Sequence, residues 1–444
     1  MTALRTQTAR GLLGNSIALL ATTHITAVFG YVFWVLCARA FSAGVIGATN
    51  TVISAMTLVA IVAVSGFVPM LTRLLPGADT EERSGLCSTA FVVTTLVSAV
   101  AGVAAALLMP ARVQAAVGTG WLVALLGAGT VGTALLLVVS AALLGVRRAE
   151  LSLYGNVMGS VARLGAVGAF LAIGVLVAGA DTNATHTILI VWVVSLAMSV
   201  VLSIWLLIRA TPGFRFHPHR IWISRMRRSI GWDHVAMIAV RAPPLTIPIL
   251  AAAHFPPAKI GYLAVVTMVI SVFSAVAAAV SNALLAHCAD DPQQLRTQAR
   301  RAFRLIGVLL VVPVLLTCLF AKEVLGFFGP DYADYSPLLI VLLLSTFPDA
   351  LINMTVAILR VQHRLAVVAA VTVAGATMSI VGAWLLMPHL GIFGAGVAVF
   401  GSQMIVATAF AVMGPLRFLV HGESADAPSE AGTSGRRKLR IGRP

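Results

Sequence analysis

Three charged side chains fall near the middle of long apolar segments: Arg163, Arg241 and Asp349. A charged residue at the bilayer centre costs roughly 2.5 to 3.5 kcal/mol on insertion scales, so each should face protein or water rather than lipid. A guanidinium stays charged at any working pH, and its planar donors can hold two phosphate oxygens at once. We therefore expect the two arginines to bind phosphate groups in a cavity.

Helical phase adds a polar neighbour to each arginine. Seven positions at about 100° per residue bring a side chain back to within about 20° of its start, which stacks Asn156 with Arg163 and His234 with Arg241. We expect both stripes to line the cavity. A purely structural alternative stays open, in which Asp349 neutralises one arginine and the other reaches backbone carbonyls or the membrane surface.

The stretch WDHVAMIAVRAPPLTIPIL, from 232 to 250, interrupts its own helix. Pro243 and Pro244 cannot donate hydrogen bonds to the carbonyls four residues earlier, so the helix should loosen beside Arg241. Free carbonyls at membrane depth are tolerated only where they line a cavity or are buried in protein. We therefore predict that this segment is both a cavity wall and a hinge.

Further residues are candidates for smaller roles. Arg39 ends the first apolar segment on the outer side and would take over the phosphate during release. His24, in the same segment, is either a proton carrier or a histidine bonded to a neighbouring backbone, and Asp349 is either a coupling group or a charge partner. The four cysteines are isolated, so we expect no metal site, no redox dithiol and no cofactor.

Membrane helices must position these residues. The chain of 444 residues is 59% hydrophobic and only 10% charged, far below the charged fraction of about a quarter in soluble proteins. About 20 apolar residues span a bilayer core, and runs of that length recur without the alternation of barrel strands. We predict an all-α polytopic membrane protein with twelve helices, at 12–38, 46–72, 87–109, 118–145, 152–178, 187–208, 230–253, 261–286, 303–326, 335–359, 364–387 and 390–413.

Basic residues predict the orientation, because loops rich in Lys and Arg stay in the cytoplasm. With the N-terminus inside, the outer loops hold only Arg39, Arg112, Lys259 and Lys322. Both termini are then cytoplasmic. The net charge of +15 is spread over every second loop rather than gathered in one domain, which argues against nucleic-acid binding.

The long basic loop after the sixth helix divides the chain into halves. We predict an N-terminal lobe at 1–208, a basic cytoplasmic linker at 209–229, a C-terminal lobe at 230–413 and a basic disordered tail at 414–444. An even number of helices per lobe gives a parallel repeat, related by a pseudo-twofold axis along the membrane normal. Secondary transporters of this kind bind substrate between the repeats and alternate its access.

Three passages carry a resemblance to a known family. They are the opening helix pair at 14–77 with Asn15, Arg39 and Gly47, the turn FFGPDYADYSP with the helix after it at 327–360, and LGIFGAGVAVFGSQMIVATAF at 390–410. In order and spacing they resemble the polysaccharide flippases of the multidrug/oligosaccharidyl-lipid/polysaccharide exporter superfamily, the Wzx-type proteins.

This resemblance implies that the chain moves an undecaprenyl-diphosphate-linked oligosaccharide from the inner to the outer leaflet of the cytoplasmic (inner) membrane, for O-antigen or exopolysaccharide synthesis. Arg163 and Arg241 would hold the diphosphate while the lipid tail stays outside. The partners would be the lipid-linked sugar, membrane lipids, and the polysaccharide polymerase or glycosyltransferases of the same pathway.

Other functions stay open. A cation-coupled multidrug antiporter of the same superfamily would need a membrane carboxylate, and Asp349 is the one firmly placed at mid-depth. A lipid II flippase usually has two further helices. A membrane glycosyltransferase is disfavoured, because the first outer loop, ARAFSAGVIGAT, has no acidic residue and no soluble domain is present, so we expect no enzyme.

Overall fold

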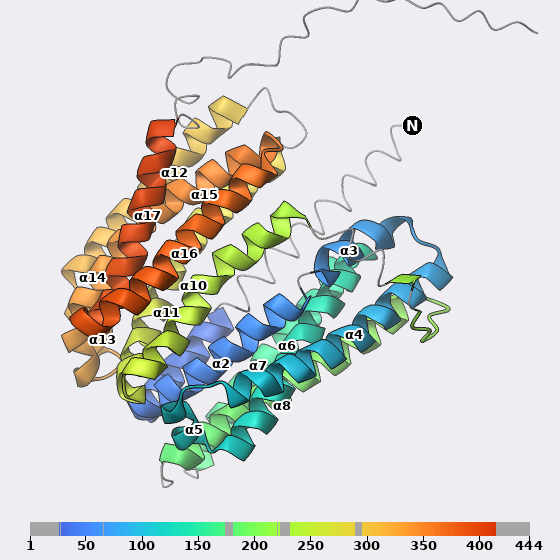
Figure 1. Cartoon of the computed structure of the whole chain (residues 1–444), viewed down its shortest axis with the longest axis horizontal. Coiled ribbons are helices and arrows are strands. Elements are labelled where there is room, and N and C mark those ends of the chain that lie inside the picture. The colour runs from blue at the N-terminus through green and yellow to red at the C-terminus, as the bar shows by residue number, and fades with distance from the viewer. Residues whose placement is uncertain are drawn as a thin grey trace, which may run out of the picture.

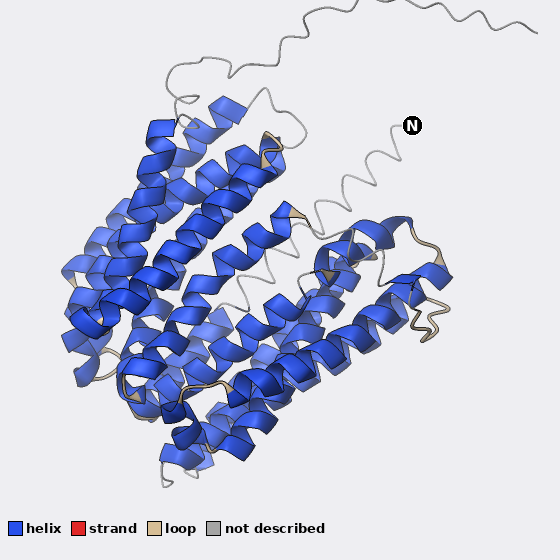
Figure 2. Ribbon diagram, viewed as in Figure 1, coloured by secondary structure: helices blue, strands red, loops and turns tan. Residues whose placement is uncertain are grey.

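The computed structural model describes residues 26, 28–64, 66–173, 181–219, 221–222, 231–288 and 295–413, and regular structure in these ranges is entirely helical (Figure 2). An N-terminal helix, Val28–Ala40, comes first. The remaining elements are α2 (Ala43–Val64), α3 (Phe67–Leu74), η1 (Leu75–Gly77), α4 (Thr80–Leu107), α5 (Ala111–Val117), α6 (Thr119–Gly145), α7 (Ala149–Ile173), α8 (Asp181–Ala210), α10 (Trp232–His254), α11 (Pro257–Cys288), α12 (Leu295–Leu319), α13 (Ala321–Gly326), η3 (Pro330–Tyr335), α14 (Ser336–Leu344), α15 (Thr346–Val361), α16 (Leu365–Leu390) and α17 (Phe393–Met413).

Within the described ranges, ten helices are long and apolar enough to cross a membrane, so the chain is a multi-pass membrane protein. The N-terminal helix and α7 overlap the first and fifth predicted segments without meeting that standard. The N-terminal helix is described over a short stretch only, and α7 carries Asn156, Arg163 and several glycines and serines. A transmembrane helix this polar must be covered by protein or line water, because lipid cannot solvate its side chains.

The helices form two groups (Figure 1). We call the helices from Val28 to Ala210 the first half and those from α10 to α17 the second half. Figure 1 shows the two groups approaching one another at one end and diverging toward the other. The halves touch mainly through α2, which packs against α10 and α11.

Two glycines join the halves at the narrow end, which we call the closed end. Gly47 of α2 and Gly261 of α11 face each other's helix, and a Cβ atom at either position would overlap the backbone carbonyl oxygen of Pro257 or Ala43. Small residues let membrane helices pack with their backbones in contact, where van der Waals attraction is strongest. The closed end is therefore a tight backbone-to-backbone junction.

The predicted linker is partly described and lies against the first half. The backbone amides of Arg215, His217 and His219 donate hydrogen bonds to the hydroxyls of Ser84, Ser88 and Thr89 on α4, at 3.2, 3.1 and 3.0 Å. These side-chain hydroxyls thus accept hydrogen bonds from backbone amides of the linker that would otherwise have no partner in the protein. The start of the linker is therefore held against α4.

Candidate functional site

The contact between α7 and α8 positions Arg163. Gly155 and Gly159 lie one turn apart on α7, so close to α8 that a Cβ atom at either would overlap the hydroxyl of Ser203 or Ser199. This is the small-residue spacing that allows close helix packing in membranes. Arg163 occupies the next position in the same row, where the helices are already close.

The Arg163 side chain is held by uncharged groups. Its Nε donates a hydrogen bond to Ser195 Oγ at 3.0 Å, and its guanidinium carbon lies 3.5 Å from the centroid of the Trp192 ring. Phe33 of the N-terminal helix lies farther away, at 5.9 Å. Among the described residues, no carboxylate pairs with Arg163. The Trp192 ring and the Ser195 hydroxyl thus orient the guanidinium. Most of its N–H groups remain available to donate hydrogen bonds to a ligand.

A cavity of about 1020 Å³ lies between the N-terminal helix, α2, α10 and α11. Its walls are largely apolar, with Asn50, Thr267 and Ser271 as polar exceptions. Arg163 does not line this cavity directly. Trp34 does line it, and the Trp34 ring centroid lies 6.3 Å from that of Trp192, the ring that the Arg163 guanidinium contacts. The guanidinium therefore sits one aromatic layer behind the cavity wall.

The structure separates the residues of the predicted stripe on α10. His234 is buried at the start of the helix, whereas Arg241, seven residues later, is exposed. α10 continues from Trp232 to His254 with three prolines inside it. Of these, Pro244 lines both the cavity between the halves and a second cavity within the second half. Arg241 itself is not among the residues that line either cavity, although a charged side chain at mid-helix is unfavourable in lipid.

Asp349 lines the second cavity, of about 480 Å³, between α10, α11, α15, α16 and α17. Asn353 Nδ2 donates a hydrogen bond to the backbone carbonyl of Asp349 at 2.9 Å, and the Asn353 and Ser274 side chains line the same cavity. Ser379, Ser402 and Gln403 add further polar atoms to the wall. No described basic residue forms an ion pair with Asp349. The alternative in which Asp349 neutralises Arg163 or Arg241 is therefore not seen among the described residues, and the neighbours of the carboxyl group in this cavity are uncharged polar side chains.

Arg39 links the two halves at the closed end. Its Nε donates a hydrogen bond to the backbone carbonyl of Phe327 at 3.1 Å, and its guanidinium carbon lies 4.1 Å from the centroid of the Phe327 ring. Phe327 follows α13 in the second half. In this conformation the side chain is therefore a bridge between the halves rather than a group facing a cavity.

The structure does not bring the candidate residues into one contact network. Asn156 donates to Ser152 O at 2.8 Å, one turn back on its own helix, rather than to a neighbour of Arg163. His24 lies outside the described residues. Sequence reasoning missed Trp192 and Ser195, although a row of glycines leading to an arginine on one helix was a signal that such partners exist.

Comparison with solved structures identifies the fold. The lipid II flippase MurJ in an inward closed conformation superposes with a TM-score of 0.71 at 12% identity, over 92% of this chain and 90% of that one. An inward-facing multidrug resistance MATE family transporter of the MOP superfamily gives 0.68 at 14% identity, over 93% and 100%. An outward-facing MATE structure gives 0.55 at 15%, over 92% and 96%. No protein-family model and no curated protein sequence matches the chain.

Proposed function

We propose that this protein is a flippase that carries an undecaprenyl-diphosphate-linked oligosaccharide from the inner to the outer leaflet of the cytoplasmic membrane. The observation that carries the proposal is Arg163, a permanently charged group at mid-helix with no carboxylate partner among the described residues. Arg163 is half-buried, and a charge withdrawn from water without a counter-ion is costly unless something compensates it. An anionic substrate that enters between the halves supplies that compensation.

The surroundings of Arg163 suit a diphosphate bound to a lipid. The guanidinium keeps free donors in a planar fork, which can bind two phosphate oxygens together. The cavity next to it has mostly apolar walls, which favour the isoprenoid units closest to the phosphates. Arg241, exposed on α10, is our candidate for a second phosphate contact. Movement of Trp34 and Trp192 would open the path between the cavity and Arg163.

The arrangement of the halves supports alternating access. They are joined at the closed end by Gly47, Gly261 and Arg39, and they diverge at the other end (Figure 1). The higher TM-score to the inward-facing than to the outward-facing MATE structure agrees with this arrangement. We propose that the closed end faces away from the cytoplasm, as the distribution of basic residues predicts. The open end then receives substrate from the inner leaflet.

Asp349 favours a second candidate, a cation-coupled multidrug antiporter. A carboxyl group in a cavity with hydroxyl and amide neighbours is suited to exchange a proton or a sodium ion. The same group is also compatible with a flippase driven by a cation gradient. The cargo, rather than the presence of this carboxyl group, therefore separates the two candidates.

The experiment compares a strain lacking this protein with one that expresses it. The proposal predicts that lipid-linked oligosaccharide accumulates on the inner leaflet of the deletion strain and that surface polysaccharide disappears, while re-expression restores both. In parallel, both strains are tested for sensitivity to cationic drugs. Unchanged surface polysaccharide together with greater drug sensitivity in the deletion strain would replace the flippase with the antiporter.

A further inference from the structure

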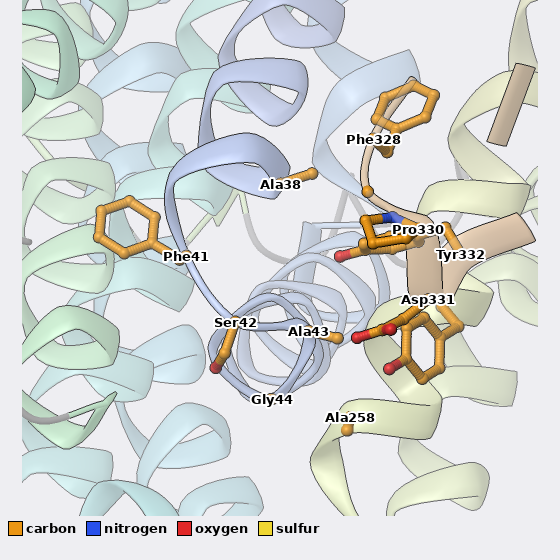
Figure 3. Close-up of a pocket in the computed structure, with 12 residues that line it drawn as sticks. Ala38, Phe41, Ser42, Ala43, Gly44, Ala258, Phe328, Pro330, Asp331 and Tyr332 are labelled. Carbon is orange, nitrogen blue, oxygen red and sulfur yellow. The ribbon is translucent and has the colours of Figure 1, made fainter. Parts of the chain in front are cut away.

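A pocket separate from the two cavities lies at the closed end (Figure 3). Its volume is about 440 Å³, and both halves contribute to it. Ser42 and Ala43 come from the start of α2 in the first half, whereas Tyr262, Asp331 and Tyr332 come from α11 and η3 in the second. The pocket thus exists only while the halves meet.

Aromatic rings form one side of this pocket. Tyr262 stacks on Tyr335 with their centroids 4.3 Å apart, and Tyr332 meets it edge-on at 5.0 Å. Phe328 continues the cluster at 6.4 Å from Tyr332. Phe328 and Tyr332 are buried, so the half-buried ring of Tyr262, held in a fixed orientation by its neighbours, is the part of the cluster on which the C–H face of a pyranose ring can pack.

Polar groups stand beside the rings. The carboxylate of Asp331 is exposed and points toward Ala43 at the start of α2 (Figure 3). Tyr332 also lines the pocket, and its buried hydroxyl has no hydrogen-bond partner among the described residues. This hydroxyl is too deeply buried for a ligand to reach it in this conformation, so Asp331 is the exposed polar group of this wall. An exposed carboxylate accepts hydrogen bonds and suits a molecule with several hydroxyl groups.

The charged side chains in and near the pocket favour some classes of ligand over others. Arg39 lies over Phe327, next to the lining residue Phe328, and Lys259 follows the lining residue Ala258, with its Nζ 5.4 Å from the Phe255 ring centroid. These two cations oppose an organic cation, and Asp331 opposes a phosphate. The described residues contain no group of three or more His, Cys, Asp or Glu side chains that could hold a metal ion. A neutral polyol fits this mixture of charges best.

We propose that the pocket is a saccharide-binding subsite on the outer face. This inference rests on the proposed function, because it assigns the pocket to the sugar part of the same substrate or to polysaccharide already outside. A sugar bound there contacts both halves, so it stabilises the closed end. Saccharide outside the membrane then opposes the opening that releases more of it.

The test uses the purified full-length chain in nanodiscs. Maltose, cellobiose and N,N′-diacetylchitobiose are added at millimolar concentrations, and binding is measured by saturation-transfer difference NMR and by the thermal unfolding midpoint. At least one of these sugars should bind. Asp331→Asn should weaken its binding by roughly tenfold or more, since a hydrogen bond to a charged group is lost. Asp334→Asn is the matched control, an exposed acid on the same turn outside the pocket, and should bind like the wild type.

The outcomes separate the subsite from the transport function. Binding of tetraphenylphosphonium but not of any sugar, or equal sugar affinity in Asp331→Asn and wild type, overturns the subsite. Neither result changes the accumulation of lipid-linked oligosaccharide in a deletion strain, which tests the flippase. Conversely, a protein that binds maltose at this pocket but has no effect on surface polysaccharide would retain the subsite and lose the proposed function.

Discussion

The two halves hold their mid-membrane charges in different settings. In the first half, Arg163 lies against the Trp192 ring and Ser195, one layer behind the cavity between the halves. In the second half, Asp349 directly lines a cavity whose wall it shares with the polar side chains of Asn353 and Ser274. The cation lies behind an aromatic ring and has no ion-pair partner among the described residues, whereas the acid lines a cavity together with uncharged polar side chains.

This difference shows that the two charges do not stabilise one another. A structural ion pair would have brought the opposite charges together and left neither for function. Instead, Arg163 lies against an aromatic ring and a hydroxyl of its own half, and Asp349 lies among uncharged polar side chains of the other half. Under the proposed function the two charges would have separate tasks, the arginine contacting the substrate and the acid serving in coupling.

Arg163→Ala is the substitution for which we expect the largest effect. It removes the proposed phosphate contact, and a charge-assisted hydrogen bond contributes about 1.5 to 3 kcal/mol, so surface polysaccharide should fall by roughly tenfold or more. Arg163→Lys should restore only part of it, because Lys lacks the planar fork. The measurement is surface polysaccharide at equal membrane protein level.

The matched control for that prediction is Arg209→Ala. Arg209 lies over the Trp205 ring at 4.4 Å, a second arginine–tryptophan pair, but at the end of α8. It should leave export unchanged. Equal export from Arg163→Ala and Arg209→Ala would mean that the pairing of Arg163 with Trp192 is structural only.

Gly47→Ala tests whether the tight contact between α2 and α11 keeps the two halves together at the closed end. In Gly47→Ala the new methyl group overlaps the Pro257 carbonyl, so α2 and α11 must move apart. Backbone displacement of this kind costs about 1 to 3 kcal/mol, so the closed-end population should fall several-fold. Spin labels on Arg112→Cys and Asp334→Cys, with native cysteines replaced, report the separation.

Gly168→Ala is the control for this change, because a Cβ there meets no atom within 4 Å. Its distance distribution should match that of the parent protein. A Gly47→Ala variant with the same distribution as the parent would show that this junction does not set the conformation.

Asp349→Asn tests the proposed coupling role of the acid in the second half. The amide keeps the size and the hydrogen-bonding capacity of the side chain but can no longer bind a cation by charge or exchange a proton. We expect a roughly two- to fivefold loss of transport, and the remainder should no longer respond to collapse of a proton or sodium gradient. Asp334→Asn serves as the exposed control. Wild-type gradient dependence in Asp349→Asn would remove the coupling role.

The smallest expected effect is that of Arg39→Ala. It removes one hydrogen bond to a backbone carbonyl and one exposed cation–π contact, together about 1 kcal/mol. The closed-end population measured with the same spin labels should drop by about two- to fivefold. A variant that instead stops export entirely would indicate that Arg39 contacts the substrate, as the sequence alone suggests.

Much of the fold follows from the order of residues along the chain. Long apolar runs locate the helices, because lipid cannot satisfy backbone groups and the helix satisfies them within the segment. The helical row of Gly155 and Gly159 before Arg163 also indicates a close neighbour, since small residues mark helix contacts. Local sequence does not say which helix that neighbour is, because the packing partner lies about 40 residues away.

The sequence by itself determined that this is a helical membrane protein with charged residues at mid-helix. Only the tertiary structure decided that Arg163 lies against Trp192, that Asp349 opens to its own cavity, and that Arg39 bridges the halves at Phe327. The reason is physical: periodicity along one helix fixes the direction of a side chain relative to that helix. Whether the side chain then contacts an aromatic ring, water or the other half depends on how segments distant in the chain pack together.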